Sequence, residues 1–238
     1  MATLKVIGSG SQQGNTYLLE TSNETLILDL GCKWNDVLKS LNYEIDKVVG
    51  ALCSHHHSDH SKSIQNALKY GINVFSNQDV ADKFKGVIAL QAKKRYKIGN
   101  FVVMPLEVEH NVPNFAYIIE HEEIGKFVFA TDLTHFPYKV KGVNHLLIEA
   151  NNSEDLIIDH LCNNEVIRSM SENHMEINET IKAIRNNITS ELNNIILCHL
   201  SDGQSDERMF KKIVFDEFGI MPYVADKGVE VTINKEEF

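Results

Sequence analysis

Cysteine is scarce in this sequence, and long apolar runs are absent. The four cysteines among 238 residues are scattered without Cys-x-x-Cys spacing, which gives no sign of a disulfide framework. No stretch approaches the roughly 18 consecutive apolar residues of a membrane span, and no signal peptide opens the chain. These absences predict a cytoplasmic protein in a reduced compartment, with no membrane partner.

Basic residues are also few. The chain carries 23 Lys and Arg against 33 Asp and Glu, a formal net charge of -10. Binding to long nucleic acid depends mainly on Lys and Arg at phosphates, so this balance argues against a broad nucleic-acid surface. A small anion remains possible, because divalent cations would reverse the local field in a pocket. The one dense basic run, 93–97, is interpreted as a solvated face, with anion binding or a subunit contact as the alternative.

Length and patterning predict one domain spanning residues 1–238. A hydrophobic content of 43% can build a sizeable core, and no repeat, long linker or low-complexity tract interrupts the chain. Short apolar runs predict strands, and apolar residues at helical spacing predict helices. The principal predicted strands are 17–20, 25–30, 48–53, 73–76, 101–104, 115–119, 126–130, 145–149, 194–198, 222–225 and 229–233; the longer predicted helices are 153–168, 176–187 and 206–218.

The stretch Ser54–His60 concentrates four histidines and one carboxylate directly after an apolar run. Imidazole nitrogen and carboxylate oxygen are ligands that zinc and similar ions prefer. In an extended loop His55 and His57 point the same way and can share one ion, while Asp59 and His60 can face a second and His56 points away. The alternative is a solvated polar loop that binds metal without chemistry.

Polar residues also follow other predicted apolar strands, namely His110, Asp132 and His199. Each alone could be a structural residue. Burying such groups unpaired is costly, so their repetition predicts a shared partner at one edge of a sheet. A pair of metal ions would be that partner.

These landmarks together resemble the metallo-β-lactamase superfamily over nearly the whole chain. They are His55-His56-His57-Ser58-Asp59-His60, Glu109-His110, Ala130-Thr131-Asp132 and Cys198-His199-Leu200. The resemblance implies an α+β fold, the αββα sandwich with metals at one edge of the two sheets. It implies one ion held by His55, His57 and His110, and another by Asp59, His60 and His199, with Asp132 as the bridge. Zinc is expected, and manganese suits the same donors.

Within the superfamily, residues 14–19 and 199–206 resemble RNase Z-like phosphodiesterases and their small phage-encoded relatives, the anti-Pycsar proteins. This resemblance implies hydrolysis of cyclic mononucleotides, with 3′,5′-cyclic CMP and UMP favoured. It further implies a viral counter-defence role in the host cytoplasm and a homodimer.

His174 falls where RNase Z-like enzymes carry a proton-donating histidine. The acidic partner that they place four residues before the bridging Asp is Val128 here, so Glu149 is expected to orient His174 instead. Two metal ions could hold the attacking and leaving oxygens while His174 protonates the leaving group. Asp59, His174 and Glu149 are therefore the predicted catalytic residues of a dinuclear phosphodiesterase.

Three other functions fit parts of this pattern. The same metal loop could serve a single-stranded DNA or RNA nuclease, or a thioester or lactone hydrolase. A non-catalytic protein that sequesters a nucleotide could keep the fold, but it has no use for a bridging Asp132.

Overall fold

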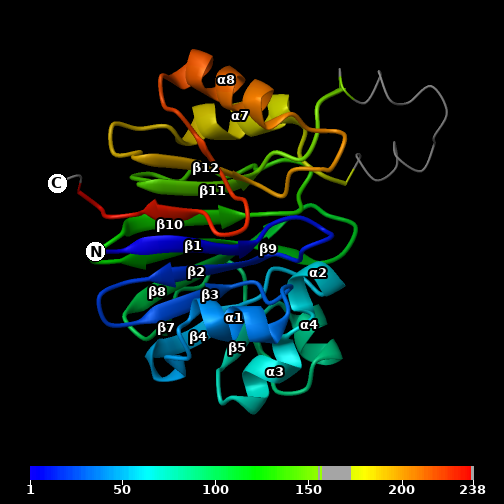
Figure 1. The fold of residues 1–238 in the computed structure, drawn as a ribbon, viewed down its shortest axis with the longest axis vertical. Coiled ribbons are helices and arrows are strands. Elements are labelled where there is room, and N and C mark those ends of the chain that lie inside the picture. Colours follow the sequence, from blue (N-terminus) through cyan, green and yellow to red (C-terminus); the bar gives the residue numbers. More distant parts are fainter. Residues whose placement is uncertain (155, 157–172, 237–238) are drawn as a thin grey trace.

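Two mixed β-sheets pack face to face in this computed structural model, which describes residues 1–154, 156 and 173–236 (Figure 1). Within these residues the first sheet has seven strands, in the spatial order β14 (Glu230–Thr232), β1 (Thr3–Gly8), β2 (Thr16–Glu20), β3 (Thr25–Leu28), β4 (Val48–Leu52), β5 (Val74–Ser76) and β6 (Ile88–Ala89). The second also has seven, in the order β13 (Tyr223–Val224), β12 (Asn194–Cys198), β11 (His145–Glu149), β10 (Gly125–Ala130), β9 (Asn114–His121), β8 (Phe101–Val108) and β7 (Tyr96–Ile98).

Helices cover the outer face of each sheet (Figure 1). Beside the first sheet lie α1 (Trp34–Ser40), α2 (Ser58–Ser61), α3 (Ile64–Lys69) and α4 (Gln78–Lys83), and a 3-10 turn (Ile45–Lys47) precedes β4. Beside the second lie α7 (Ile177–Asn187) and α8 (Glu207–Phe218). The predicted αββα sandwich is confirmed.

Each sheet is apolar on both faces, because one face meets the other sheet and the opposite face meets helices. Tyr17 of β2 packs edge-on against Phe129 of β10, with ring centroids 5.8 Å apart, in the core between the sheets. The next residue of β2, Leu18, faces the opposite side of the sheet and belongs to the hydrophobic cluster beneath α1, with Trp34 and Val37. Strands buried on both sides need continuous apolar runs, which explains the unbroken sequences of β2 and β3.

The outer helices of the second sheet begin and end as their sequences indicate. Ile177, Ile181 and Ile184 form the buried face of α7. The Asp206 side chain accepts a hydrogen bond from the Met209 N–H at the start of α8, and Gly219 ends that helix with φ 71. The predicted helix 153–168 lies outside the described residues apart from its first few positions.

The direction of the strands determines where in the fold the candidate site lies. β10, β11, β12 and β13 run parallel to one another, so their carboxyl ends meet at one edge of the second sheet. Asp132 follows β10, Glu149 ends β11 and His199 follows β12. In the first sheet β3, β4 and β5 are also parallel, and His55 follows β4.

Strand β7 was not predicted, because it includes part of the basic run 93–97 and its Lys97 is exposed. Arg95 in that run pairs with Glu120 at 2.6 Å on the surface, which agrees with the interpretation of a solvated face. Among the described helices none is long and apolar enough to cross a membrane.

Candidate metal centre

Six separate segments bring the predicted site residues to one edge of the sandwich. The loop after β4 carries His55 and His57, and the short helix α2 carries Asp59 and His60. The remaining side chains lie at or after the ends of four strands of the second sheet, or just before α7: His110, Asp132, Glu149, His174 and His199. Asp59, His174 and His57 are partly exposed, the other side chains are buried, and every predicted site residue lies within this one cluster.

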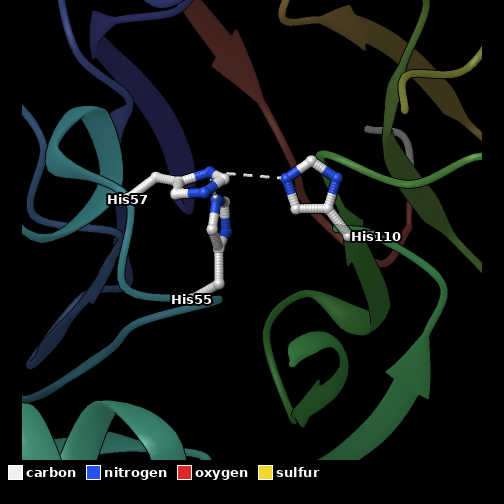
Figure 2. Close-up of side chains that lie close together, drawn as sticks. All are labelled: His55, His57 and His110. Atoms are coloured by element: carbon white, nitrogen blue, oxygen red, sulfur yellow. Dashed lines mark hydrogen bonds between the residues drawn. The ribbon is translucent and has the colours of Figure 1, made fainter. Parts of the chain in front are cut away.

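His55, His57 and His110 form the first of three groups of candidate ligands among the described residues, and the third, which overlaps the second, is Asp132, Glu149, His174 and His199. Figure 2 shows their three rings converging, two from the loop after β4 and one from the loop after β8. Nε2 of His55 lies 3.0 Å from Nδ1 of His57, and Nε2 of His110 lies 3.4 Å from that same Nδ1. Burial lowers the pKa of all three imidazoles. The neutral form that results is the one that binds metal ions.

The second group contains Asp59, His60, Asp132 and His199, whose ligand atoms all lie within 4.8 Å of one another. Oδ1 of Asp132 lies 3.2 Å from Nε2 of His60 and 3.6 Å from Nε2 of His199. Its other oxygen, Oδ2, lies 3.9 Å from Nε2 of His55 and 4.0 Å from Nε2 of His110. Asp132 therefore presents Oδ2 to the first group and Oδ1 to the imidazoles of the second, as a bridging ligand must.

The charge state of the second group also suits a cation. Burial raises the pKa of Asp132, but the charges of His199 and His60 outweigh it and hold that pKa well below its usual range. Against the opposing effect of burial, Asp132 and neighbouring carboxylates raise the pKa of His199 to about 10. His199 is therefore protonated at neutral pH when no metal ion is bound, and a bound metal ion would take the place of that proton.

The surroundings of Nε2 of His199 indicate whether the residues of the second group fit a metal ion. This nitrogen is buried and has no hydrogen-bond partner among the described residues. Buried polar atoms are rarely left unsatisfied, and here the orphan nitrogen faces two carboxylates and another imidazole. A donor set of imidazole nitrogen and carboxylate oxygen fits divalent metal ions. The roles of the individual ligands stay predictions.

Asp29 supports this site but was not singled out in the sequence, where it looked like part of a strand. Its Oδ2 lies 2.6 Å from Nδ1 of His60, and its Oδ1 accepts a 2.7 Å hydrogen bond from the Ser54 N–H. A carboxylate on Nδ1 fixes the ring so that Nε2 faces the metal side. The available signal was a polar residue after the apolar run of β3, the same signal that identified Asp132.

Asn15 was also missed. Its Nδ2 lies 2.9 Å from Nε2 of His60 and 3.4 Å from Oδ2 of Asp59, while its Oδ1 accepts a 2.7 Å hydrogen bond from the Gly10 N–H. The backbone N–H of Asn15 donates to the Asp59 carbonyl at 2.7 Å. The loop between β1 and β2 is thus tied directly to helix α2, which carries the candidate ligands Asp59 and His60.

Glu149 contacts both His174 and His199. Oε1 of Glu149 lies 2.6 Å from Nδ1 of His174 and 3.1 Å from Nδ1 of His199, and its Oε2 accepts from the Leu133 N–H at 2.9 Å. Burial lowers the pKa of His174, but the Glu149 carboxylate outweighs burial and raises it. The expected partnership of Glu149 and His174 is therefore present as a hydrogen bond, and its catalytic role stays a prediction.

The other residues of the sequence motif point elsewhere. His56 turns away from the clusters, with Nδ1 2.5 Å from Oδ2 of Asp79 and the Lys83 ammonium at 2.8 Å. Cys53 and Cys198 are buried free thiols, and burial raises the pKa of both well above the usual value. Both therefore stay protonated and pack in the core.

Comparison with known proteins decides the family. Residues 10–147 match the Metallo-beta-lactamase superfamily. The chain belongs to the metallo-beta-lactamase superfamily. With its candidate metal-ligand groups, it is a hydrolase of this superfamily.

Two bacterial exodeoxyribonucleases are similar in sequence. Exodeoxyribonuclease YycJ of Bacillus anthracis is 26% identical over 250 residues, covering 90% of this chain and 89% of that protein. Exodeoxyribonuclease WalJ of Streptococcus pneumoniae is 27% identical over 173 residues, covering 64% of this chain and 63% of that protein.

Solved structures share the metallo-beta-lactamase fold across nearly the whole chain. YhfI from Bacillus subtilis has a TM-score of 0.76 at 18% identity, covering 98% of this chain and 100% of that one. The short form of human tRNase Z has a TM-score of 0.66 at 12% identity, covering 97% and 99%. A diphosphatase of the PhnP family has a TM-score of 0.68 at 13% identity, covering 97% and 96%. The expected RNase Z-like neighbours are thus present, and the resemblance to anti-Pycsar proteins stays a prediction.

Proposed function

We propose that this chain is a dinuclear metal-dependent phosphodiesterase acting on a nucleotide. The observation that carries the proposal is the position of Asp132 between the two ligand groups, with Nδ1 of His174 4.0 Å from its Oδ2. Such a site places a candidate proton donor beside a candidate pair of cations. Hydrolysis of a phosphodiester uses both.

His55, His57 and His110 would hold one cation, and Asp59, His60 and His199 the other, with Asp132 shared. Bound there, two divalent cations, zinc in our proposal, would supply Lewis acidity toward the phosphodiester and the attacking water. Manganese suits the same donors. Asp59 would contribute as a ligand at the mouth of the site, where 18% of its side chain is exposed.

The protein's own proton chemistry centres on His174. Its Nδ1 is engaged by Glu149, so Nε2 is the atom that would donate a proton to the leaving oxygen. The neighbouring carboxylate raises the pKa of His174 against the effect of burial, and a protonated ring at neutral pH is the state that a general acid needs. Glu149, fixed by the Leu133 and Met175 N–H groups, would hold the ring in place.

Cyclic mononucleotides are the first candidate substrates, with 3′,5′-cyclic CMP and UMP favoured. The net charge of -10 supports a small anion over a long polyanion, since only a local cation pair is needed to bind one phosphodiester. This substrate class would suit the anti-Pycsar resemblance and a viral counter-defence role. A homodimer in the host cytoplasm belongs to the same proposal.

A DNA end is the second candidate substrate. The support is the likeness to exodeoxyribonuclease YycJ, which extends over 90% of this chain. An exonuclease needs to grip only the terminal part of its substrate, which lessens the objection from net charge. Hydrolysis of a thioester or lactone would not require the hydrogen bond between His174 and Glu149.

One panel of substrates distinguishes these candidate functions. The purified protein is assayed with the four 3′,5′-cyclic mononucleotides, a single-stranded DNA oligonucleotide, bis(4-nitrophenyl) phosphate and a thioester, each with and without chelator. Chelator-sensitive hydrolysis of the cyclic pyrimidines supports the first candidate, and shortening of the oligonucleotide from one end supports the second. Hydrolysis of the thioester with every phosphodiester intact would overturn the proposal.

A further inference from the structure

A polar cavity of about 320 Å³ opens beside the candidate metal centre. One wall is the loop after β1, residues 9–13, and the opposite wall is the loop after β12, residues 200–204. His174 and Asn151 also line the cavity. The proposed proton donor thus sits where the cavity meets the metal centre.

The lining can form many hydrogen bonds but carries almost no charge. Ser11, Gln12, Gln13 and Gln204 supply neutral donors and acceptors, and among the described lining residues the one charged group apart from His174 is the Asp202 carboxylate. Within the described part of the chain, the structure gives no side-chain hydrogen bond to the three glutamines. Their amides are therefore available to a ligand, and the lining residues that the structure describes include no Lys or Arg that would bind a second phosphate.

The cavity walls are anchored to the metal centre. Ser9 Oγ accepts hydrogen bonds from the His199 N–H and from the Tyr17 hydroxyl, both at 2.9 Å. On the other side the Ser201 N–H donates to the Asn151 carbonyl at 2.9 Å. Asn151 Nδ2 in turn donates to the His199 carbonyl at 2.8 Å. Both walls therefore keep a fixed position relative to a candidate metal ligand.

The size of the cavity limits what it can hold. Ligand pockets range from about 300 to 1,000 Å³, so this one lies at the small end and suits a single nucleoside-sized group. The edges of a nucleobase and the hydroxyls of a sugar are neutral donors and acceptors, as the glutamines and serines require.

We propose that this cavity is a nucleoside subsite, which holds the base and sugar of one nucleotide while its phosphodiester lies at the metal centre. The inference rests on the proposed phosphodiesterase function and deepens it. The enzyme would act on a mononucleotide or on the last nucleotide of a chain, and not within a continuous strand. Gln12 and Gln204, from opposite walls, would determine nucleotide affinity.

The test compares Gln204→Ala and Gln12→Ala with a control, Gln65→Ala, on the exposed face of α3. Removing a hydrogen bond to the nucleoside should raise KM for the nucleotide substrate about 10-fold with kcat unchanged. Hydrolysis of bis(4-nitrophenyl) phosphate, which has no nucleoside, should stay at the wild-type rate in all three variants. Equal KM values in the cavity variants and the control would overturn the subsite.

A binding measurement tests the subsite without turnover. Chelator-treated protein is mixed with cytidine, uridine, thymidine or adenosine and examined by saturation-transfer difference NMR. At least one nucleoside should bind to the wild type and to Gln65→Ala, and bind at least about five-fold more weakly to Gln204→Ala. No binding to the wild type would overturn the subsite. Failure of all phosphodiesters to react would instead overturn the proposed function, and the nucleoside measurement would still stand by itself.

Discussion

Oδ2 of Asp29 lies 2.6 Å from Nδ1 of His60, at a position where both side chains are fully buried. The contact leaves Nε2 of His60 facing Asp132 and Asp59. Asp29 is not itself a candidate metal ligand, but it fixes the orientation of His60, which is one. This relationship leads to the first prediction.

Asp29→Asn should lower the affinity of the second metal position by about 10- to 100-fold, because the amide cannot replace the carboxylate that fixes the His60 ring. Chelator competition followed by elemental analysis measures the loss. Asp79→Asn is the matched control, since Asp79 pairs with His56 on the side away from the clusters. Similar affinities in the two variants would contradict the role given to Asp29.

His174→Ala should reduce turnover by about 100- to 10,000-fold, the usual contribution of a general acid, while leaving metal content unchanged. Asp132→Ala and His60→Ala should abolish turnover and lose metal, because each removes a predicted ligand. Rate measurements paired with elemental analysis of the same samples check this division. If all three variants lost metal equally, His174 would be a structural or ligand residue and not an acid.

His145 should make stability depend on pH independently of the metal centre. It lies at the start of β11, and burial lowers its pKa to about 4. The unfolded chain, with the ordinary value of about 6.5, binds a proton between pH 6.5 and 4 when the folded protein does not, so stability is full above pH 6.5 and falls below it. The loss amounts to about 3 kcal/mol by pH 4.

Urea unfolding at pH 7.5 and pH 5 measures this effect. His145→Gln should narrow the difference in unfolding free energy between the two pH values. The comparison of variant with wild type cancels the contribution of groups elsewhere, including the metal centre. An unchanged difference would show that the His145 ring does not titrate differently in the folded protein.

Gly31→Ala should destabilise the fold by about 3 kcal/mol, because a methyl group there would lie 1.6 Å from the Asp59 carbonyl oxygen. Neither backbone segment can move freely, since α2 is bonded to Asn15 in the same place. Gly71→Ala is the control: its φ is +81° but nothing lies within 4 Å, so it should cost only about 1 to 2 kcal/mol. Thermal and chemical unfolding measure the loss of stability in each variant. A larger loss for Gly71→Ala than for Gly31→Ala would contradict the packing described.

The fold was predictable where local patterns were strong. The apolar runs of β2, β3 and β11 and the isoleucine face of α7 each follow from burial on one or two sides. Strand β7 was missed because its residues belong to a basic run, and its pairing with β8 outweighs that local signal.

The site was predictable to the extent that its residues stand out from their surroundings. The histidine loop and the polar residues after β10 and β12 interrupt apolar sequence, so they were found. Asp29 and Asn15 were not, because their partners lie 31 and 45 residues away in the sequence. The cavity was even less visible, since its two walls come from opposite ends of the chain and meet only when the sheets have packed.

The order of strands along the chain also sets the order in which the candidate ligands are synthesised. The first ligand group uses only His55, His57 and His110, so all of its residues are in the chain once residue 110 has been added. The second group must wait for Asp132 and then for His199, which follows the late strand β12. A growing chain therefore contains the three histidines of the first group before it contains the candidate bridging carboxylate of Asp132, and His199 is added last.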